Sequence, residues 1–549
     1  MPGARQVSGV RDVSSITVED RYDALTVRRF REAGWWRDRH LTAHLDEWAE
    51  SAPGRTFAGD GKRSVTYSEL QGAAYRLGES LVDLGIGPGD RVIVQLPNWV
   101  EFAIAYLAIT RIGAVLVPIM TIYRDDEVRY IADHSGAVAA FTTGEFRGFD
   151  HARMFRGLRS RCPALRDLII VRGDREDGEH HIDDLTARGS ADPGRLGPTP
   201  GSDQPHVIGY TSGTESRPKG CLHTWNTYGF SARGLAHSIL RLTAEDTVFM
   251  PSPVAHSTGL VVGVCSPIVA GCGTHLLDVW EPSVGLERIA RYGCTVTATA
   301  TPFARMAIDA YRPGEHDLRS MRLWLCAGAP IPSSLVGELT AVFTGCSMVP
   351  LWGCSEFLAG TCCTLEDPIE AVTGSDGRPA LDGVEIRVVD PEGVVVAEGG
   401  EGELLYRGPG GLLGYWRDPE RTAAAIDTGG WYHSGDLAIR KPGGYVRVSG
   451  RIKDLIIRGG VNISALEVEE HLESHPKVSS AAVVGYPDER LGEKACAFVV
   501  PSGTEPPTLE ELTSYLRTER RIAVHKLPER LEVVDSLPVT ASGKVQKFE

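Results

Sequence analysis

The sequence contains no long uninterrupted apolar run, and this absence sets a first limit on what the protein can be. Its most apolar stretches are interrupted by Arg111 and Pro267, well short of the roughly 20 apolar residues that span a bilayer as a helix. The segment from Met1 to Asp23 is polar and lacks the apolar core of a secretion signal. We therefore expect a cytoplasmic protein with no membrane partner.

Cysteine pairs with metal-binding spacing are also missing. The chain has 11 cysteines, an odd number, and none are spaced Cys-x-x-Cys. The adjacent Cys362 and Cys363 fit neither a zinc site nor a disulfide framework. The cysteine pattern therefore indicates a reducing compartment.

Clustered positive charge is the third feature that the sequence lacks. The formal net charge is −15 at pH 7, and no block of Lys and Arg offsets it locally. This charge opposes the phosphate backbone of nucleic acid, so we do not expect a nucleic-acid partner. With 549 residues, the chain is too long for one hydrophobic core and should divide into several domains.

Helix and strand patterns alternate along the first part of the chain. Apolar residues recur at helical spacing from Leu70 to Leu84, which predicts an amphipathic helix with Ser68 as its N-cap and Gly85 at its end. A continuous apolar run predicts a buried strand over 91–96, and the next helix is predicted over 101–113. Such alternation is typical of α/β folds.

The later segments change in character. Short strands are predicted over 137–143 and 168–171, and the polar stretch 173–205 is predicted to be a surface loop. From Gly383 onward the alternation becomes that of a small antiparallel sheet or barrel. The terminal segment has a helical pattern over 467–472 and a strand pattern over 481–484, which indicates a separate small α+β unit.

One polar loop carries the clearest chemical signal. The segment Tyr210-Thr211-Ser212-Gly213-Thr214-Glu215-Ser216-Arg217-Pro218-Lys219-Gly220 directly follows an apolar run. Short hydroxyl residues, glycines and a lysine behind a strand can surround phosphate oxygens. The loop differs from the common nucleotidase P-loop, because no glycine precedes Lys219 and no Ser or Thr follows it. On this loop alone, a polar surface turn is an equally good interpretation.

Several other stretches gain meaning only in combination. Taken alone, each is as well explained by a structural turn, a surface acid or an ordinary ion pair. They are Met250 to Gly259 with His256, Leu323 to Pro330, Leu351 to Glu356, Trp431 to Asp436, Gly450 to Asp454 and Pro538 to Lys544. Asp436 and Arg451 have the donors and acceptors to bind the two hydroxyls of a ribose.

In this order and spacing, these stretches resemble the adenylate-forming superfamily of acyl-CoA synthetases, beetle luciferases and peptide-synthetase adenylation domains. The resemblance covers nearly the whole chain. It implies an α/β fold in which a large N-terminal domain, residues 1–452, combines two α/β subdomains with a β-barrel. A small mobile α+β domain, residues 453–549, would carry the terminal lysine.

The resemblance also implies a reaction. A carboxylic acid and ATP would give an acyl-adenylate and pyrophosphate, and a thiol, here coenzyme A, would then take the acyl group and release AMP. Because two anions must meet, positive charge is needed at the α-phosphate, and Mg²⁺ with its preference for oxygen ligands is the expected metal. Lys544 would bridge the carboxylate and α-phosphate, and Glu356 would hold the metal.

The resemblance assigns the remaining roles residue by residue. The residues implied as catalytic are Lys544, Glu356, His256 and Thr211. Those implied to bind ATP are Thr211, Ser212, Gly213, Thr214, Lys219, Gly328, Ala329, Pro330, Leu351, Trp352, Gly353, Ser355, Glu356, Asp436, Val448, Arg451 and Lys544. Lys453 would be the hinge, and Arg458, Gly459 and Gly460 would line the thiol path. Glu215 departs from the family pattern, since it puts a negative charge in the phosphate loop.

The expected acid pocket points to a class of substrate. Its residues would be His256, Gly259, Gly263, Cys354, Ala359 and Gly360. No Asp or Glu occurs from Met250 to Val264, so nothing in that wall would pair with the ammonium group of an amino acid. The small residues favour a wide pocket. The sequence around His256 most resembles that of ligases for cyclohexanecarboxylate and similar ring acids. We expect a bulky alicyclic or aromatic acid, up to the size of a terpenoid.

Two alternatives remain open. A stand-alone adenylation enzyme would load the acyl group onto a carrier protein instead of free CoA. A non-catalytic relative would bind the nucleotide or acid as a sensor, although the presence of Lys544, Glu356 and Asp436 disfavours it. A homodimer is also compatible with the sequence.

Overall fold

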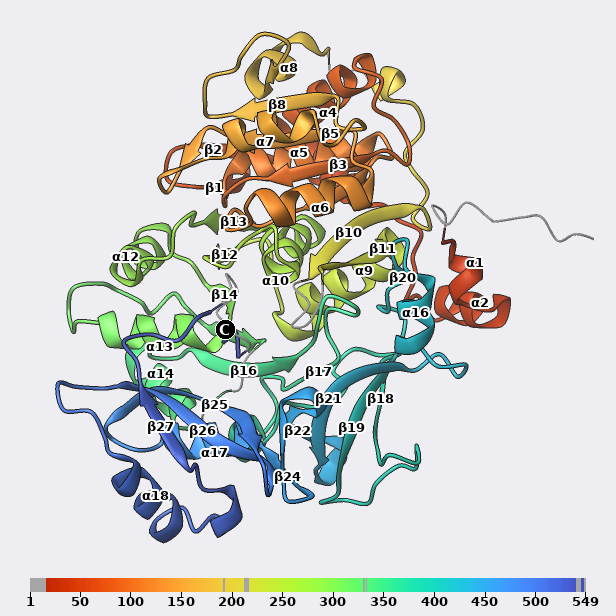
Figure 1. Cartoon of the computed structure of the whole chain (residues 1–549). Coiled ribbons are helices and arrows are strands. Elements are labelled where there is room, and N and C mark those ends of the chain that lie inside the picture. Colours follow the sequence, from red (N-terminus) through yellow and green to blue (C-terminus); the bar gives the residue numbers. More distant parts are fainter. Residues whose placement is uncertain are drawn as a thin grey trace, which may run out of the picture.

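The computed structural model describes residues 16–190, 193–211, 217–328, 331, 333–539 and 545–547. Two eight-stranded sheets form the larger part of the molecule (Figure 1). The first has the order β17-β16-β15-β14-β12-β13-β1-β2, with β1 Thr56–Gly59, β2 Ser64–Thr66, β12 Thr247–Met250, β13 Gly273–Leu276, β14 Val296–Thr299, β15 Leu323–Ala327, β16 Ser347–Trp352 and β17 Thr361–Cys362.

The second sheet has the order β20-β11-β10-β4-β3-β5-β8-β9. Its strands are β3 Arg91–Gln95, β4 Val115–Pro118, β5 Ala139–Thr143, β8 Asp167–Val171, β9 His180–His181, β10 Pro205–Thr211, β11 Lys219–Thr224 and β20 Gly414–Tyr415. In both sheets the central strands run parallel, as strand pairs linked by helices require. The predicted α/β class is therefore confirmed.

The predicted helices and strands of the first part are present. Helix α4 spans Tyr67–Asp83 and α5 spans Val100–Arg111, on either side of β3 in the chain. The predicted N-cap was wrong: Thr66, and not Ser68, accepts a hydrogen bond from the backbone N–H of Glu69 and completes a capping box. Every residue of α5 is buried, which agrees with its apolar composition.

The prediction of a plain surface loop over 173–205 was also wrong. Helix α8, Ile182–Arg188, lies within this segment and packs against α4 through two buried apolar residues, Ile182 and Leu185. Ser80 of α4 donates a hydrogen bond to the carbonyl of Leu185 at 2.7 Å. Two apolar residues among many polar ones gave too short a pattern to indicate this helix.

Beyond the two-stranded sheet of β6 Glu145–Phe146 and β7 Phe149–Asp150, the remaining strands form two antiparallel-rich units. The small sheet predicted after Gly383 has the order β18-β19-β21-β22, with β18 Glu385–Val389, β19 Glu401–Arg407, β21 Tyr432–Arg440 and β22 Val446–Arg451. The C-terminal unit has a sheet of β23 Leu455–Arg458, β24 Val461–Ser464, β25 Val478–Asp488, β26 Gly492–Pro501 and β27 Arg530–Val533, with helices α17 Ala465–Glu473 and α18 Leu509–Thr518.

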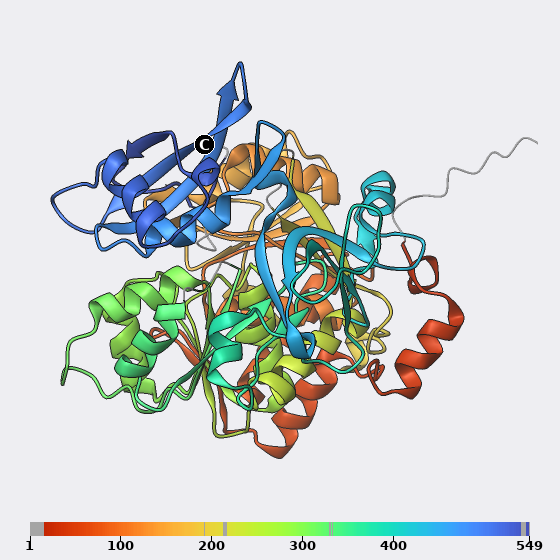
Figure 2. The ribbon, with the colours of Figure 1, turned by 90° about the horizontal axis from the view of Figure 1, so that it is seen from below.

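The C-terminal unit has a hydrophobic core of its own. Its buried side chains run from Ile456 to Leu516 and form a cluster distinct from the main core. Figure 2 shows this unit, in blue, as a lobe set apart from the rest of the ribbon. Arg447 of β22 and Glu470 of α17 form an ion pair at 2.8 Å between the lobe and the small sheet. The boundary at 452/453 remains a prediction.

Asn98 ties the two large sheets together. It follows β3 of the second sheet and is buried, and its side-chain amide donates to three carbonyls at the ends of first-sheet strands: Met250 at 3.2 Å, Ser252 at 2.8 Å and Leu277 at 3.0 Å. Its carbonyl oxygen accepts from the N–H of Val254 at 2.8 Å. A single side chain thus satisfies polar backbone groups that no water would reach.

We expect Asn98→Ala to destabilise the protein by about 3 kcal/mol, because the substitution leaves buried carbonyls and one N–H without partners. Thermal unfolding measures the effect as a midpoint lowered by several degrees. The exposed Asn462 of β24 provides a matched control, and Asn462→Ala should leave the midpoint unchanged. Equal midpoints for the two variants would contradict the role of Asn98.

Candidate active site

The predicted phosphate loop joins two neighbouring antiparallel strands. Thr211 ends β10, Lys219 begins β11, and the two residues lie opposite each other in the ladder. Ser212, Gly213 and Thr214, which the sequence assigns to phosphate binding, lie outside the described residues, as does Glu215. The hairpin therefore fixes both ends of the loop and places Lys219 at its base.

Lys219 meets Glu356 beside this loop. The ammonium Nζ lies 2.9 Å from Oε1 of Glu356 and donates to the hydroxyl of Tyr415 at 2.7 Å. The Tyr415 hydroxyl in turn donates to the same Glu356 oxygen at 2.8 Å, and the Tyr432 hydroxyl lies 3.2 Å from it. The structure thus brings together two residues that lie in separate motifs and adds two tyrosines that the sequence analysis missed.

Glu356 remains ionised in this setting. It is 4% exposed, and burial by itself raises the pKa of a carboxyl. The charge and hydrogen bond of Lys219, with further hydrogen bonds from Cys354 and Tyr415, outweigh burial and lower the pKa of Glu356 to about 2. Burial lowers the pKa of Lys219, but the charge of Glu356 and its hydrogen bond, with smaller contributions from nearby groups, together outweigh burial and raise the pKa. Both groups are therefore charged at neutral pH.

This donor set suits a magnesium ion. Mg²⁺ prefers hard oxygen ligands and is usually held by one or two carboxylates together with phosphate oxygens. Glu356 offers an ionised carboxylate next to the phosphate-loop hairpin, which fits that preference. Among the described residues, no cluster of three or more His, Cys, Asp or Glu side chains could hold a metal without a ligand's help.

A second cluster lies beside Ser355. The hydroxyls of Ser355 and Ser257 share a hydrogen bond at 2.9 Å, and His223 donates from Nε2 to the carbonyl of Ser355 at 2.8 Å. Burial lowers the pKa of His223 to about 4, so its ring is neutral. His256 precedes the short helix α10, Ser257–Leu260, and its side chain caps it by accepting from the N–H of Thr258.

The predicted ribose residues lie together. Asp436 of β21 and Arg451 of β22 are ladder partners, and Arg451 Nε donates to Asp436 Oδ1 at 2.8 Å. Trp352, at the end of β16, donates from its indole N–H to Asp436 Oδ2 at 2.8 Å. Asp436 and Trp352 are each 8% exposed, so the charge of Asp436 is held by partners on both oxygens.

Three further predicted nucleotide residues lie at or directly after the ends of β15 and β16. Gly328 directly follows β15 and adopts a φ of +82°, a conformation that favours glycine. Leu351 lies beside Ala327 in the parallel pair of β15 and β16. Gly353 is required by packing, since a Cβ there would lie 2.0 Å from the carbonyl oxygen of Leu358. Ala329 and Pro330 lie outside the described residues.

Val448 occupies β22 opposite Ala438, and its N–H donates to Asp376 at 2.8 Å. Its side chain is half-buried and packs against the main hydrophobic core. The structure thus places Val448 on the same strand as Arg451, three residues before it.

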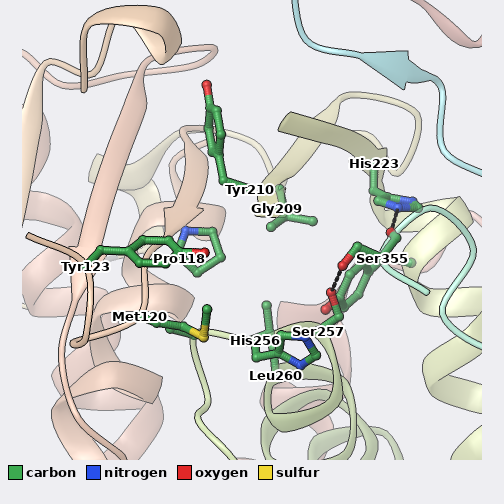
Figure 3. A pocket seen from close by; sticks show the side chains of 13 residues that line it. Pro118, Met120, Tyr123, Gly209, Tyr210, His223, His256, Ser257, Leu260 and Ser355 are labelled. Carbon is green, nitrogen blue, oxygen red and sulfur yellow. Dashed lines mark hydrogen bonds between the residues drawn. The ribbon is translucent and has the colours of Figure 1, made fainter. Parts of the chain in front are cut away.

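A pocket opens between the two large sheets, next to Ser355 (Figure 3). The empty space in it is about 450 Å³, which includes the open solvent at its mouth. Its lining residues are Pro118, Met120, Tyr123, Val207, Gly209, Tyr210, His223, Tyr228, Ala255, His256, Ser257, Leu260 and Ser355. No Asp, Glu, Lys or Arg is among these lining residues.

The expected acid-pocket residues differ in what surrounds them in the structure. His256 lines this pocket. At three glycines the missing side chain faces other protein atoms: a Cβ would lie 2.0 Å from the Pro253 carbonyl oxygen at Gly259, 2.6 Å from Met250 at Gly263 and 2.4 Å from the Trp352 ring at Gly360. Their small size therefore has a packing reason. An enlargement such as Gly259→Leu would disturb the fold and would not report on substrate volume.

Cys354 and Ala359 remain candidates for the acid wall. Ala359 is buried, and Cys354 is half-buried with a hydrogen bond to Glu356. Burial raises the pKa of the Cys354 thiol well above its usual value, so it is a neutral thiol.

The predicted hinge residue directly precedes the C-terminal sheet, and the predicted thiol-path residues lie at the first turn of that sheet. Lys453 is the middle residue of the short turn Ile452–Asp454 between β22 and β23. Gly459 and Gly460 form the β23–β24 turn, with φ values of +58° and +81°. Arg458 is bonded to Glu529 at 2.7 Å. Lys544 lies outside the described residues, between Val539 and Val545, which pair as an isolated bridge.

Comparisons with known proteins identify the family of the chain. Residues 45–416 match the AMP-binding enzyme family, and residues 467–544 match the AMP-binding enzyme C-terminal domain. The chain belongs to the AMP-binding enzyme family. It is therefore an adenylate-forming enzyme of the AMP-forming acyl-CoA synthetase class that binds ATP and a carboxylic acid.

Among its relatives, the medium-chain fatty-acid–CoA ligase of Escherichia coli (strain K12) is 35% identical over 94% of this chain and 91% of its own length. The salicyl-AMP ligase / salicyl-S-ArCP synthetase of Mycobacterium tuberculosis is also 35% identical, over 94% of this chain and 91% of its own. A 3-[(3aS,4S,7aS)-7a-methyl-1,5-dioxo-octahydro-1H-inden-4-yl]propanoyl:CoA ligase of the same organism is 33% identical over 93% and 98%.

Among solved structures, an anthranilate CoA ligase in complex with anthranoyl-AMP superposes with a TM-score of 0.86. It is 25% identical, and the match covers 94% of this chain and 96% of that one.

Within the described part of the chain, no helix is both long and apolar enough to span a bilayer.

We expect Asp436→Asn to weaken ATP binding by about 10-fold or more, because an amide cannot accept hydrogen bonds from Arg451, Trp352 and a ribose hydroxyl together. Isothermal titration with ATP and Mg²⁺ measures the change. Asp177→Asn is the control, because Asp177 is exposed and lies between β8 and β9. This variant should bind ATP with the affinity of the unaltered protein. Unchanged affinity of Asp436→Asn would exclude the ribose role.

Proposed function

We propose that the protein is an ATP-dependent acid–CoA ligase for a bulky alicyclic or aromatic carboxylic acid. One observation supports this proposal: a charged ion pair, Lys219 with Glu356, lies next to a pocket that is lined by uncharged residues, among them Ser355. The two are joined along the chain, since Ser355 lines the pocket and the next residue, Glu356, holds the charge.

The pocket favours a neutral acyl group. A second carboxylate or an ammonium would find no opposite charge among its lining residues, and an unpaired buried charge is costly. Met120, Val207 and Leu260 offer apolar surface, and the neutral rings of Tyr228 and His223 offer flat walls. The relative from Mycobacterium tuberculosis named for a bicyclic propanoyl group supports the alicyclic part of the proposal.

In the first step, a carboxylate oxygen attacks the α-phosphorus of ATP, and the bond to pyrophosphate breaks. Lys219 and the loop after β10 would hold the phosphates, and Asp436 with Arg451 would hold the ribose. Mg²⁺ held by Glu356 would supply positive charge for the leaving pyrophosphate. Lys544 would bridge the two anions, which places one more positive charge where negative charge develops.

In the second step, the thiol sulfur of CoA attacks the acyl carbon and AMP leaves. We propose that the C-terminal lobe turns about Lys453, which lies in the turn between β22 and β23, so that Lys544 is exchanged for the turn at Gly459 and Gly460. Both glycines have positive φ values, which favour glycine, and the turn therefore carries no side chains at these two positions.

A carrier protein is the competing thiol source. The salicyl-AMP ligase of Mycobacterium tuberculosis is also named a salicyl-S-ArCP synthetase. Its match covers as much of this chain as the match of the medium-chain fatty-acid–CoA ligase does. The choice between free CoA and a phosphopantetheine-bearing carrier is therefore part of the test.

We expect ring acids such as cyclohexanecarboxylate or benzoate derivatives to release pyrophosphate faster, in kcat/KM, than acetate, palmitate or any amino acid. The measurement is a pyrophosphate-release screen over these acids, each with no thiol, with CoA and with a phosphopantetheinylated carrier protein. Thioester formation with CoA supports the ligase. A clear preference for acetate, palmitate or an amino acid would refute the acid class, and transfer to the carrier alone would refute the CoA acceptor.

We expect Lys544→Ala to slow adenylation by about 100-fold or more, the size of the loss when one well-placed electrostatic donor is removed. Thioester formation from supplied acyl-adenylate should persist, because that step does not need charge at the α-phosphate of ATP. ATP–pyrophosphate exchange and single-turnover thiolysis measure the two steps separately. Near-normal exchange in the variant would refute the assignment.

A further inference from the structure

Tyr415 holds a position that the adenylation chemistry above does not use. Its hydroxyl has one hydrogen to donate and two lone pairs to accept with. The hydrogen goes to Glu356 Oε1 at 2.8 Å. The lone pairs accept from Lys219 Nζ at 2.7 Å and from the Tyr432 hydroxyl at 3.2 Å. The hydrogen-bonding capacity of this one hydroxyl is thus filled by three contacts, to Glu356, Lys219 and Tyr432.

The backbone brings this hydroxyl to its place. Strand β20 is only two residues long, yet it pairs with β11, so that Tyr415 lies opposite Cys221 and Gly414 opposite Leu222. The N–H of Trp416 donates to the carbonyl of Gly220, directly after Lys219, at 2.8 Å. The N–H of Leu412 donates to the carbonyl of Glu356 itself at 2.7 Å.

The same short segment is therefore bonded both to the phosphate-loop hairpin and to the segment that carries Glu356. The ring of Tyr415 adds a further contact, because the Lys219 ammonium lies 4.5 Å from its centroid. The N–H of Tyr415 donates to the hydroxyl of Thr422, on helix α16, Pro419–Ala425, at 2.9 Å. Tyr415 is thus held from several sides and buried.

We propose that Tyr415 is a positioning residue for the magnesium–ATP complex, whose hydroxyl fixes the Glu356 carboxylate and keeps Lys219 against it until the nucleotide arrives. Both charged groups donate to or accept from a single oxygen of Tyr415, so neither can move without changing a bond to it. The proposal rests on ATP binding and on Glu356 as the metal ligand, and does not depend on which acid or thiol is used.

The consequence concerns what happens when Lys219 leaves. Glu356 Oε1 accepts from Lys219 and from Tyr415. When phosphate oxygens attract the ammonium, the Tyr415 donor remains on the carboxylate and preserves its orientation, with Tyr432 behind it. Without the hydroxyl, Glu356 would lose both of these contacts as the nucleotide binds and would keep only the weaker hydrogen bond from the Cys354 thiol. Ordering its carboxylate would then cost affinity.

The test compares ATP affinity with and without the metal. Kd for ATP is measured by titration calorimetry in excess Mg²⁺ and again in a chelator, and the ratio of the two values is the magnesium enhancement. We expect Tyr415→Phe, which keeps the ring and the strand pairing, to lower this enhancement by about 10-fold, the scale of one hydrogen bond to a charged group. The chelator value should change little, because Lys219 stays available to the phosphates.

Tyr406→Phe is the matched control. Tyr406 is another buried tyrosine of this region and stacks on Phe357, the residue after Glu356, with ring centroids 4.1 Å apart. It should keep the enhancement of the unaltered protein. Tyr432→Phe, which removes only the outer hydroxyl, should show a smaller loss than Tyr415→Phe.

Three results would overturn the proposal. One is an unchanged enhancement in Tyr415→Phe, even if its thermal midpoint falls, since that describes a purely structural tyrosine. Another is an equal loss in Tyr406→Phe, which would indicate general loosening. The last is a lack of magnesium enhancement in the unaltered protein, which would remove the metal role of Glu356. None of these outcomes depends on acid turnover, so the acid–CoA assignment stands or falls separately.

Discussion

The ion pair between Lys219 and Glu356 is the constraint on which the site depends. Taking two charges out of water costs several kcal/mol for each ion, and mutual attraction offsets this only when the geometry and the hydrogen bonds are good. Here both conditions hold, with Nζ and Oε1 2.9 Å apart and a tyrosine hydroxyl bonded to both groups. The pair satisfies each charge until phosphate and metal, which carry the opposite charges, are present.

The fold makes this pair possible by bringing three sheets together at strand ends. Lys219 starts β11 of the second large sheet, Glu356 follows β16 of the first, and β20 leads into the small antiparallel sheet that carries Asp436. Parallel strands end on the same side, and ligands of α/β proteins usually bind there. The predicted nucleotide residues that the structure describes therefore lie at strand ends that come together, although they are spread from Thr211 to Arg451 in the chain.

Local patterns allowed part of this to be predicted from the sequence. Periodicity indicated α4, β3 and α5, and the order of short motifs indicated the family, because the residue types of each motif are set by chemistry. Tyr415 was missed because its partners lie 59 and 196 residues away and nothing local marks a tyrosine as a bridge. The small size of Gly259 has two interpretations, because a glycine needed for close packing looks the same in sequence as one that leaves room for a substrate. Its place in the acid pocket stays a prediction.

The identity of the acid is less visible for a physical reason. The nucleotide site is built from ion pairs and hydrogen bonds, and losing one such partner is costly, so its residues form recognisable motifs. The pocket is built from uncharged surface drawn from several elements, where one methylene changes discrimination by only about 1–3 kcal/mol. Relatives that match this chain at 33% to 35% identity accordingly carry names for a fatty acid, an aryl acid and a bicyclic acid. We therefore expect the shape of the pocket, rather than any single motif, to decide which acid is activated.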